Sequence, residues 1–264
     1  MHYVKIKREV TGECNICGLV RKLSWDHIPP QVAGNTDPLM LVSAVSAITG
    51  TPQEARSLIS QNGYKLRTIC GECNSRIGRE YDPTIGKLCA GVNQYLKSPL
   101  TLPAEAAFDT IPTRLVRGLL SHILASKLQP NKNLVNEQVR AYLKASPARL
   151  HPSLHLYYWL YPYAEISVTN DVGLLLYDGG PQEHGLFTVM KFSPIALVLT
   201  NVPRFPGIPD LCQFAEFGMD DPGRVFLRFD NVRPQAWPEG EAILLGGQSM
   251  RESVSGRPRD RIRR

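Results

Sequence analysis

The spacing of hydrophobic and polar residues divides this chain of 264 residues into two regions. In the first region, apolar and polar positions alternate in short stretches, as in β-strands, and helical spacing follows them. Residues 3–10 are predicted to form a short strand or an extended arm. The other predicted strands are residues 19–25 and 64–69, and the predicted helices are residues 74–81 and 84–97. We therefore expect a small unit in which short strands lead into helices.

Residues 38–62 interrupt this pattern and are predicted to form a helical insert. Pro38 to Ile48 is a short, apolar segment. Thr51-Pro52-Gln53-Glu54 then has the form of a capping box with proline at the first helical position. Gly63 would end this second helix of the insert.

The second region starts with two predicted helices, residues 112–128 and 134–145, and the first of them has a wide apolar stripe. Seven short runs of strand-forming residues follow, separated by glycine and proline: 154–161, 165–169, 173–177, 186–192, 195–200, 225–229 and 242–245. This order is typical of a mostly antiparallel sheet with helices on one side.

These patterns predict an α+β fold in three parts. Residues 1–98 would form a ββα unit that carries the insert at 38–62. Residues 99–250 would form an α+β domain of at least two helices and a mostly antiparallel sheet, and residues 251–264 a basic, disordered tail.

The composition is that of a globular protein without a membrane segment. Apolar residues make up 43% of the chain, and no run approaches the roughly 20 apolar residues of a membrane span. Residues 1–5 contain charged and polar positions but no apolar signal segment behind them. We expect a cytoplasmic protein with no membrane partner.

The net charge of +6 is concentrated at the two ends of the chain. Residues 1–98 carry 12 Lys and Arg against 8 Asp and Glu, residues 99–250 carry 12 against 14, and residues 251–264 carry 6 against 2. The positive ends would favour a polyanion such as a nucleic acid, although four thiolates around a zinc ion would reduce the charge of the first part.

Two Cys-x-x-Cys pairs predict a metal site. Cys14 and Cys17 form one pair, Cys70 and Cys73 form the other, and glycine follows or splits each pair. Four thiolates complete a tetrahedral Zn²⁺ site, so this zinc would be structural and chemically inert. One pair opens a hairpin and the other opens a helix, which is the arrangement of a treble-clef site. The other two cysteines, Cys89 and Cys212, are interpreted as free thiols of the core.

Three polar residues lie beside this zinc site without being needed for it. Asp26 and His27 end the strand that faces the helix, and Asn74 follows the last cysteine at the start of that helix. Carboxylate and amide oxygens suit Mg²⁺ or Mn²⁺, and a neutral histidine can deprotonate a water molecule. Arg76 and Arg79 in the first turns of the helix are candidate phosphate contacts. These are the parts of a one-metal phosphodiesterase.

At residues 10–85 the sequence resembles the HNH, or ββα-metal, endonucleases. It is most similar to their four-cysteine zinc branch with an Asp-His-Asn triad, as in phage junction-resolving endonucleases. The resemblance implies that His27 is the general base and that Asp26 and Asn74 hold the catalytic Mg²⁺ or Mn²⁺. It also implies DNA as the substrate, with RNA left open, and 5′-phosphate and 3′-hydroxyl products. Nucleases of this kind with added domains often belong to phage defence or to mobile elements.

The sequence departs from the family at one position. Many members carry a central asparagine shortly before the second cysteine pair, where it braces the histidine loop. Lys65 or Leu66 stands there in this chain, and Asn35 or Asn62 is a possible substitute. This departure keeps open an alternative function, a zinc-binding module without catalysis that binds nucleic acid or a protein.

Other candidate residues have simpler interpretations. His151 and His155 lack a third metal ligand, and His122 is placed on the polar face of its helix. The aromatic residues at 157–163 are interpreted as sheet packing, not as a base-stacking surface. The second region could also sense a small ligand or a regulatory protein, but nothing in it names one.

Overall fold

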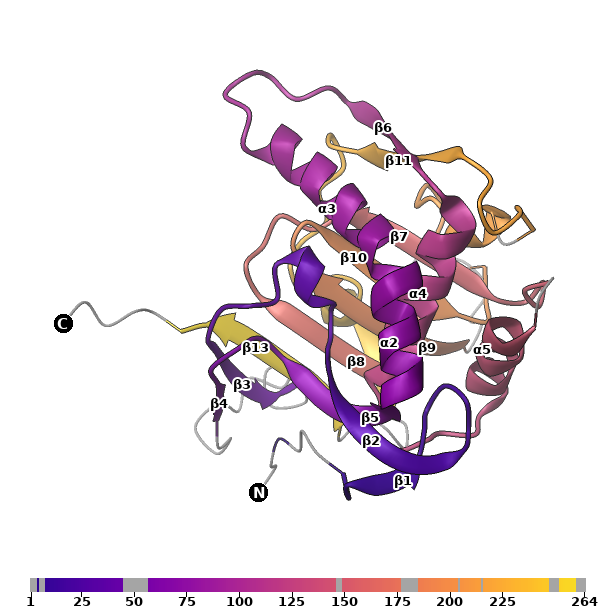
Figure 1. Cartoon of the computed structure of the whole chain (residues 1–264). Coiled ribbons are helices and arrows are strands. Elements are labelled where there is room, and N and C mark those ends of the chain that lie inside the picture. Colours follow the sequence, from indigo (N-terminus) through magenta and orange to yellow (C-terminus); the bar gives the residue numbers. More distant parts are fainter. Residues whose placement is uncertain are drawn as a thin grey trace.

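A computed structural model describes residues 4, 8–44, 57–145, 149–176, 185–203, 205–214, 216–246 and 252–259. These residues form an α+β fold in which the strands pair antiparallel. Figure 1 shows α2, α3 and α4 in front of the larger sheet, with a small sheet below them. The α+β class predicted from the sequence is confirmed.

The small sheet has the strand order β1-β2-β5 and leads directly into two helices. The bounds of these elements are Thr11–Glu13 for β1, Val20–His27 for β2, Lys65–Cys70 for β5, Gly71–Glu80 for α2 and Asp82–Leu96 for α3. An irregularity in the pairing of β2 with β5 lies between Ser24 and Trp25. Because it interrupts the strict alternation of faces, Leu23 and Asp26 are both buried although they are three residues apart.

The larger sheet combines strands from both ends of the chain. Its order is β4-β3-β13-β8-β9-β10-β7, and β12 also pairs with β8. The bounds are Leu39–Ser43 for β3, Leu58–Ser60 for β4, His155–Leu160 for β7, Ile166–Leu176 for β8, Gly185–Phe192 for β9, Ile195–Thr200 for β10, Ala242–Gly246 for β12 and Val254–Pro258 for β13. Among the described strands, β13 is the one that joins the hairpin of β3 and β4 to the rest of the sheet.

Among the described residues, a two-stranded ribbon and three short 3₁₀ helices complete the fold. The ribbon stands at the top of Figure 1 and pairs β6, Glu105–Thr110, with β11, Gly223–Arg228. The 3₁₀ helices are η1, Gln31–Ala33, η3, Leu211–Phe214, and η4, Glu239–Glu241.

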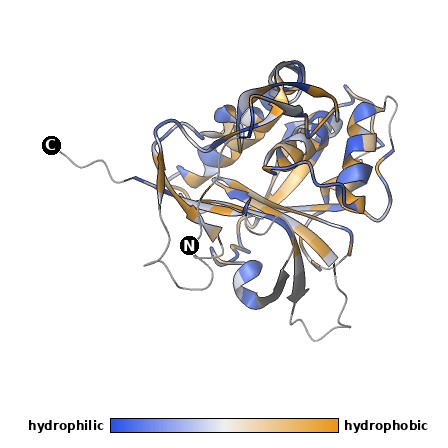
Figure 2. Ribbon diagram, turned by 90° about the horizontal axis from the view of Figure 1, so that it is seen from below, coloured by the Kyte–Doolittle hydropathy of each residue, from blue (hydrophilic) through white to orange (hydrophobic). Residues whose placement is uncertain are grey.

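Helix α4, Pro112–Ala125, lies at the centre of the molecule, and α5, Leu134–Lys144, follows it. Every residue of α4 except Arg114 is buried. Its Gly118 lies against α3, where a Cβ atom would stand 2.9 Å from Cδ1 of Ile85 and from Cβ of Tyr81, so a larger residue would push the helices apart. Most helices in Figure 2 carry both hydrophilic and hydrophobic positions, as surface helices do.

The structure differs from the sequence-based expectation at the insert and at the tail. Residues 39–43 and 58–60 form β3 and β4 where helices were predicted, while residues 45–56 lie outside the described residues. Residues 254–258 of the predicted disordered tail form β13 inside the sheet, and residues 260–264 lie outside the described residues. Both segments become strands because they pair with each other, which is a contact between distant parts of the sequence.

The remaining elements follow the predictions closely. The helices predicted at 112–128 and 134–145 are α4 and α5, and the strand at 154–161 is β7. The strands predicted at 165–169 and 173–177 are one strand, β8, with an irregularity around Asp171, whose φ of 45° lies in the left-handed region. Strand β6 has no counterpart among the predicted strands. Of the segment predicted at 3–10, residues 3 and 5–7 lie outside the described residues, and the first described strand is β1, at 11–13.

The two predicted regions share one apolar core. One cluster of buried residues runs from Cys14 and Ile16 to Val225 and Leu227, and a second, smaller cluster lies within the second region. The predicted boundary after residue 98 stays a prediction. Among the described residues, no helix combines the length and the apolar character that crossing a bilayer requires.

Candidate metal centre and adjoining polar site

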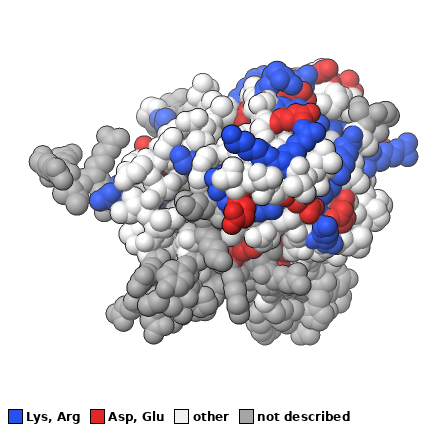
Figure 3. Space-filling model, turned by 60° about the horizontal axis from the view of Figure 1, so that its bottom comes forward, with Lys and Arg blue, Asp and Glu red and all other residues white. Residues whose placement is uncertain are grey.

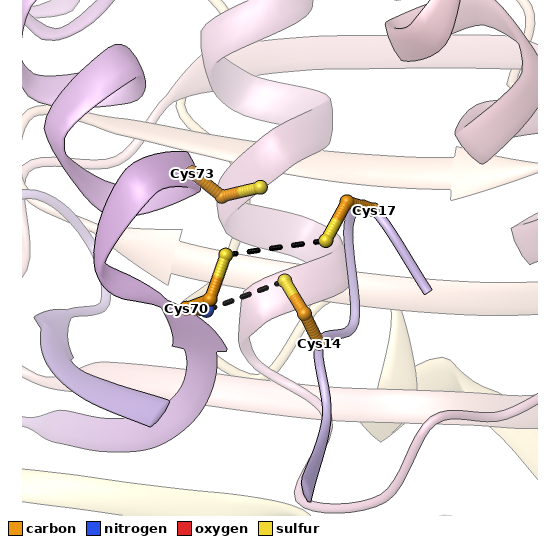
Figure 4. A group of neighbouring side chains, drawn as sticks. All are labelled: Cys14, Cys17, Cys70 and Cys73. Atoms are coloured by element: carbon orange, nitrogen blue, oxygen red, sulfur yellow. Dashed lines mark hydrogen bonds between the residues drawn. The ribbon is translucent and has the colours of Figure 1, made fainter. Parts of the chain in front are cut away.

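Four cysteines meet at the junction of the small sheet and α2. Cys14 and Cys17 lie in the turn between β1 and β2, Cys70 ends β5, and Cys73 lies in the first turn of α2 (Figure 4). Their sulfur atoms all lie within 4.8 Å of one another. The Sγ atoms of Cys17 and Cys70 are 3.9 Å apart, close to the spacing of about 3.8 Å that four Zn–S bonds of 2.3 Å impose in a tetrahedron. The cluster therefore fits a zinc ion.

The surroundings of Cys14 favour its thiolate. The thiol of Cys73 and the backbone N–H groups of Cys17, Cys70 and Ile16 lower the pKa of Cys14, because each donates a hydrogen bond to its sulfur. The N–H of Cys70 lies 3.3 Å from this sulfur. Backbone amides directed at sulfur are a typical feature of a site for a thiolate-bound metal.

The turn that holds Cys14 and Cys17 is fixed by the second region of the chain. Asn15, between the two cysteines, is 1% exposed and donates from Nδ2 to the carbonyl oxygens of Leu124 (3.0 Å) and Lys127 (2.5 Å). Arg140 of α5 donates to the carbonyl of Asn15 at 2.8 Å. Asn15 thus bonds to carbonyls at the end of α4 and just past it, and it docks the turn of Cys14 and Cys17, the metal turn, at that place.

Asp26 and His27 are consecutive at the end of β2 and lie in different environments. Asp26 is 6% exposed, whereas His27 is only partly buried. Nε2 of His27 lies 3.2 Å from the carbonyl oxygen of Asn62, which can only accept a hydrogen bond. Nε2 therefore carries the proton, and in the neutral ring Nδ1 has the free lone pair.

Asn74 joins the start of α2 to the end of β2. Its Nδ2 donates to the carbonyl of Trp25 at 2.8 Å and to Oγ of Ser24 at 3.2 Å. These bonds place Asn74 beside the backbone next to Asp26 and leave Oδ1 of the amide as an acceptor. The structure thus places Asn74 against the end of β2, where Asp26 and His27 follow Trp25. The side chain of Asp26 is directed at His122 and that of His27 at the carbonyl of Asn62.

A buried histidine from α4 lies against Asp26. His122 is 0% exposed, with Nδ1 3.5 Å from Oδ2 of Asp26 and Nε2 2.8 Å from Oδ1 of Asp82. Burial alone would lower its pKa, but the carboxylates of Asp26 and Asp82 outweigh burial and raise the pKa of His122 to about 10. The prediction that His122 lies on a polar face was wrong, because α4 has no such face.

Asn35 braces the loop that follows His27. It is 3% exposed, donates from Nδ2 to the carbonyls of Pro29 (2.7 Å) and Tyr64 (2.8 Å), and accepts from the N–H of Tyr64 at 2.7 Å. Gly63 (φ 61°) approaches so closely that a Cβ atom would lie 2.2 Å from the carbonyl oxygen of Asn35. Of the two asparagines considered from the sequence, Asn35 braces with its side chain and Asn62 contributes its carbonyl. In the sequence, the feature that marks these two asparagines is the glycine next to each, Gly34 beside Asn35 and Gly63 beside Asn62.

Basic residues surround the site on two sides. Trp25 is 42% exposed on β2, with the Lys65 ammonium 6.0 Å and the Arg67 guanidinium 5.5 Å from its ring centre. On α2, Arg76 is partly buried and Arg79 is exposed and pairs with Glu80 at 3.0 Å. Figure 3, which brings the lower side of Figure 1 forward, shows Lys and Arg side chains gathered on one half of that face, with acidic ones among them.

A groove of about 640 Å³ lies between the first turns of α3, the end of α2 and the ribbon of β6 and β11. Four cationic side chains line it: Arg79, Lys87, Arg114 and Arg224. Its acidic residues, Glu80 and Asp109, pair with Arg79 and Arg224, and the buried Oγ1 of Thr110 has no hydrogen-bond partner among the described residues.

The other candidate residues have structural roles. His155 pairs with Asp210 at 2.8 Å, and His151 bonds to Ser153 at 2.7 Å. Tyr157, Tyr158, Trp159 and Tyr161 are buried, so the interpretation of the aromatic run as sheet packing is confirmed. Cys89 is buried, as expected, and Cys212 is partly buried.

Neither the scan against protein-family models nor the searches of curated proteins and of solved structures returned a match for this chain.

Proposed function

We propose that this chain is a metal-dependent endonuclease of the ββα-metal type that hydrolyses phosphodiester bonds in DNA. The observation that carries the proposal is the contact of Asn74 with the backbone of Trp25 at 2.8 Å. It links the start of α2 to the end of β2, where Asp26 and His27 lie, beside a cluster of four cysteines that has no need of these residues as ligands. The path from β2 to β5 to α2 around that cluster supports a treble-clef unit.

The residues fit a hard divalent cation next to the zinc site. Oδ2 of Asp26 is buried and has no hydrogen-bond partner among the described residues, and Asn74 donates only from Nδ2. Asp26 and Oδ1 of Asn74 would hold Mg²⁺ or Mn²⁺. When bound, this ion would offset negative charge on the phosphate and on the leaving oxygen.

His27 supplies the base in this proposal. The carbonyl of Asn62 holds the Nε2 proton, so Nδ1 accepts the proton of a water molecule as its oxygen attacks phosphorus. The bond from phosphorus to the 3′ oxygen breaks, and solvent protonates the leaving oxygen. The products carry a 5′-phosphate and a 3′-hydroxyl, as the resemblance to the family implies.

The surroundings support a polyanionic substrate. Lys65 and Arg67, the two cations near the Trp25 ring, belong to β5. In the pairing of β5 with β2, Lys65 is opposite His27 and Arg67 is opposite Trp25. The groove that begins at Arg79 continues from α2 toward the ribbon with four cations. A DNA strand could run from the Trp25 side across the site and into this groove, where its phosphates would meet positive charge.

The test is cleavage of supercoiled plasmid by the zinc-loaded protein with Mg²⁺ or Mn²⁺, and with EDTA as control. We expect His27→Ala to abolish cleavage while zinc content and the circular dichroism spectrum stay unchanged. His151→Ala is the matched control, because His151 is exposed and its side chain bonds locally to Ser153. Full activity of His27→Ala would overturn the mechanism, and preference for an RNA of the same sequence would change the substrate.

The alternative is a zinc-dependent module that binds nucleic acid without cutting it. The exposed Trp25 with its two cations favours this function equally, because such a surface binds DNA whether or not His27 is active. A wild-type protein that binds the plasmid and cleaves it with neither metal would establish the alternative. Cys70→Ser should lose zinc and solubility under either function.

A further inference from the structure

His122 of α4 connects the candidate metal-holding carboxylate to a second carboxylate on α3. Its ring lies between Oδ2 of Asp26, 3.5 Å from Nδ1, and Oδ1 of Asp82, 2.8 Å from Nε2. The three residues come from β2, α4 and the first position of α3. The side chain of His122 is 0% exposed, against 7% for Asp26 and 17% for Asp82.

The geometry fixes the orientation of this ring. Each ring nitrogen of His122 faces one carboxylate, Nδ1 that of Asp26 and Nε2 that of Asp82. The short contact with Asp82 sets the rotation of the ring, and this rotation directs Nδ1 at Asp26.

The helix that carries His122 cannot move freely. The carbonyl of Ala125 accepts a hydrogen bond from Oγ1 of Thr68 at 2.6 Å, and that of Leu124 accepts one from Asn15 at 3.0 Å. Both donors belong to the unit that contains the cysteine cluster. The distance from His122 to Asp26 is therefore set by the same elements that shape the candidate active site.

The contact with Asp26 differs from an ordinary structural ion pair. The contact with Asp82 is a hydrogen bond, but Nδ1 of His122 and Oδ2 of Asp26 have no hydrogen-bond partner among the described residues. Oδ2 of Asp26 therefore faces Nδ1 of His122 at 3.5 Å without forming a hydrogen bond of good geometry. A carboxylate in this state is fixed in direction and still able to bind a cation.

We propose that His122 is a positioning residue for Asp26, anchored by Asp82, and that it fixes the carboxylate for binding of the divalent cation. This inference rests on the proposed function for the role of Asp26. In this proposal, α4 from the second region of the chain helps to position a side chain of the candidate active site.

Two substitutions separate the two contacts of the ring. In His122→Gln the amide reaches the place of Nε2, which keeps the contact with Asp82 and loses the one with Asp26. In His122→Asn the amide lies at the place of Nδ1, which keeps the contact with Asp26. Ser121→Ala is the matched control, because Ser121 is also buried in α4 and bonds only within the helix, to the carbonyl of Arg117.

The measurement is the affinity of the zinc-loaded protein for Mn²⁺ by electron paramagnetic resonance, together with the Mn²⁺ concentration that gives half-maximal cleavage. We expect His122→Gln to weaken Mn²⁺ binding about tenfold or more, since residues that orient metal ligands typically contribute that much. His122→Asn should recover part of the affinity, and Ser121→Ala should match the wild type. Zinc content should stay the same in all three variants.

The outcomes distinguish this inference from the proposed function. Unchanged or tighter Mn²⁺ binding in His122→Gln would overturn the role of His122, whether or not the protein cleaves DNA. Mn²⁺ binding by the wild type without cleavage would overturn only the endonuclease, and no Mn²⁺ binding would overturn both. If His122→Gln does not fold, Asp82→Asn loosens the same anchor from a less buried position, and unchanged Mn²⁺ affinity there would again contradict the inference.

Discussion

At the scale of single residues, Asn35 shows how one side chain can shape the candidate site without taking part in chemistry. Its three hydrogen bonds connect the segment after His27 with the segment that enters β5. All three partners are backbone groups of Pro29 and Tyr64, and Tyr64 is 1% exposed. The loop of His27 therefore depends on this amide for its shape.

Asn35→Ala should destabilise the protein by about 2–4 kcal/mol, because it leaves buried backbone groups without partners. Urea unfolding would measure this loss, and the cleavage rate should fall as well, since the loop that positions His27 loosens. Asn62→Ala is the control, because Asn62 contributes only its carbonyl to His27, which alanine retains. Equal stability of the two variants would contradict the bracing role.

Short motifs predicted the residues of the site whose partners are close in sequence. The cysteine pairs and Asp26-His27 are visible because the spacing within each motif reflects local geometry. His122 could not be predicted in this way. The apolar stripe of its helix suggested an outward position, but the sheet, α3 and the metal turn bury α4 on every side. Only the packing of distant elements decides that.

At the scale of elements, the sequence predicted the helices and strands whose hydrophobic pattern is sufficient to assign them without knowledge of tertiary contacts. Helices α4 and α5 and strands β7, β9 and β10 have clear periodicity or a strong content of strand-forming residues. Strand β3, with the sequence Leu-Met-Leu-Val-Ser, is a short apolar run that periodicity cannot assign, and β13 contains glycine and proline. These two become strands because they pair with each other.

The groove beside α3 combines elements from both predicted regions and should bind the phosphate backbone of a substrate. We expect Lys87→Ala and Arg224→Ala to weaken DNA binding and to reduce the slope of log affinity against log salt concentration by about 1 each. Fluorescence anisotropy at several salt concentrations would measure the slope.

Arg228→Ala is the matched control for the groove. Arg228 is in the same strand β11, is likewise exposed and likewise pairs with an aspartate, Asp230, as Arg224 pairs with Asp109, but Arg228 does not line the groove. An equal change of slope in Arg228→Ala would show that only the net charge matters. An unchanged slope in Lys87→Ala and Arg224→Ala would place the substrate elsewhere.

At the scale of the whole molecule, two kinds of contact hold the two predicted regions together, and a third extends the junction within the second region. Strand β13 from the end of the chain lies between β3 and β8. The metal turn bonds to the end of α4 through Asn15. Lys127, which follows α4, is buried and bonds to Asp171 of β8, to Asn136 of α5 and to Thr188 of β9, so the same junction continues into the larger sheet.

Proteolytic cleavage of the chain between the two predicted regions should therefore leave the two fragments bound to each other. Residues 101–103 are exposed and outside any helix or strand, so a protease site placed there should be cut without unfolding the protein. We expect the two fragments to elute together in gel filtration and to separate only in urea, because both the apolar core and the sheet extend across the cut. A fragment of residues 1–100 that elutes alone with its zinc would instead show an independent domain, and the support of Asp26 by α4 would then be dispensable for the fold.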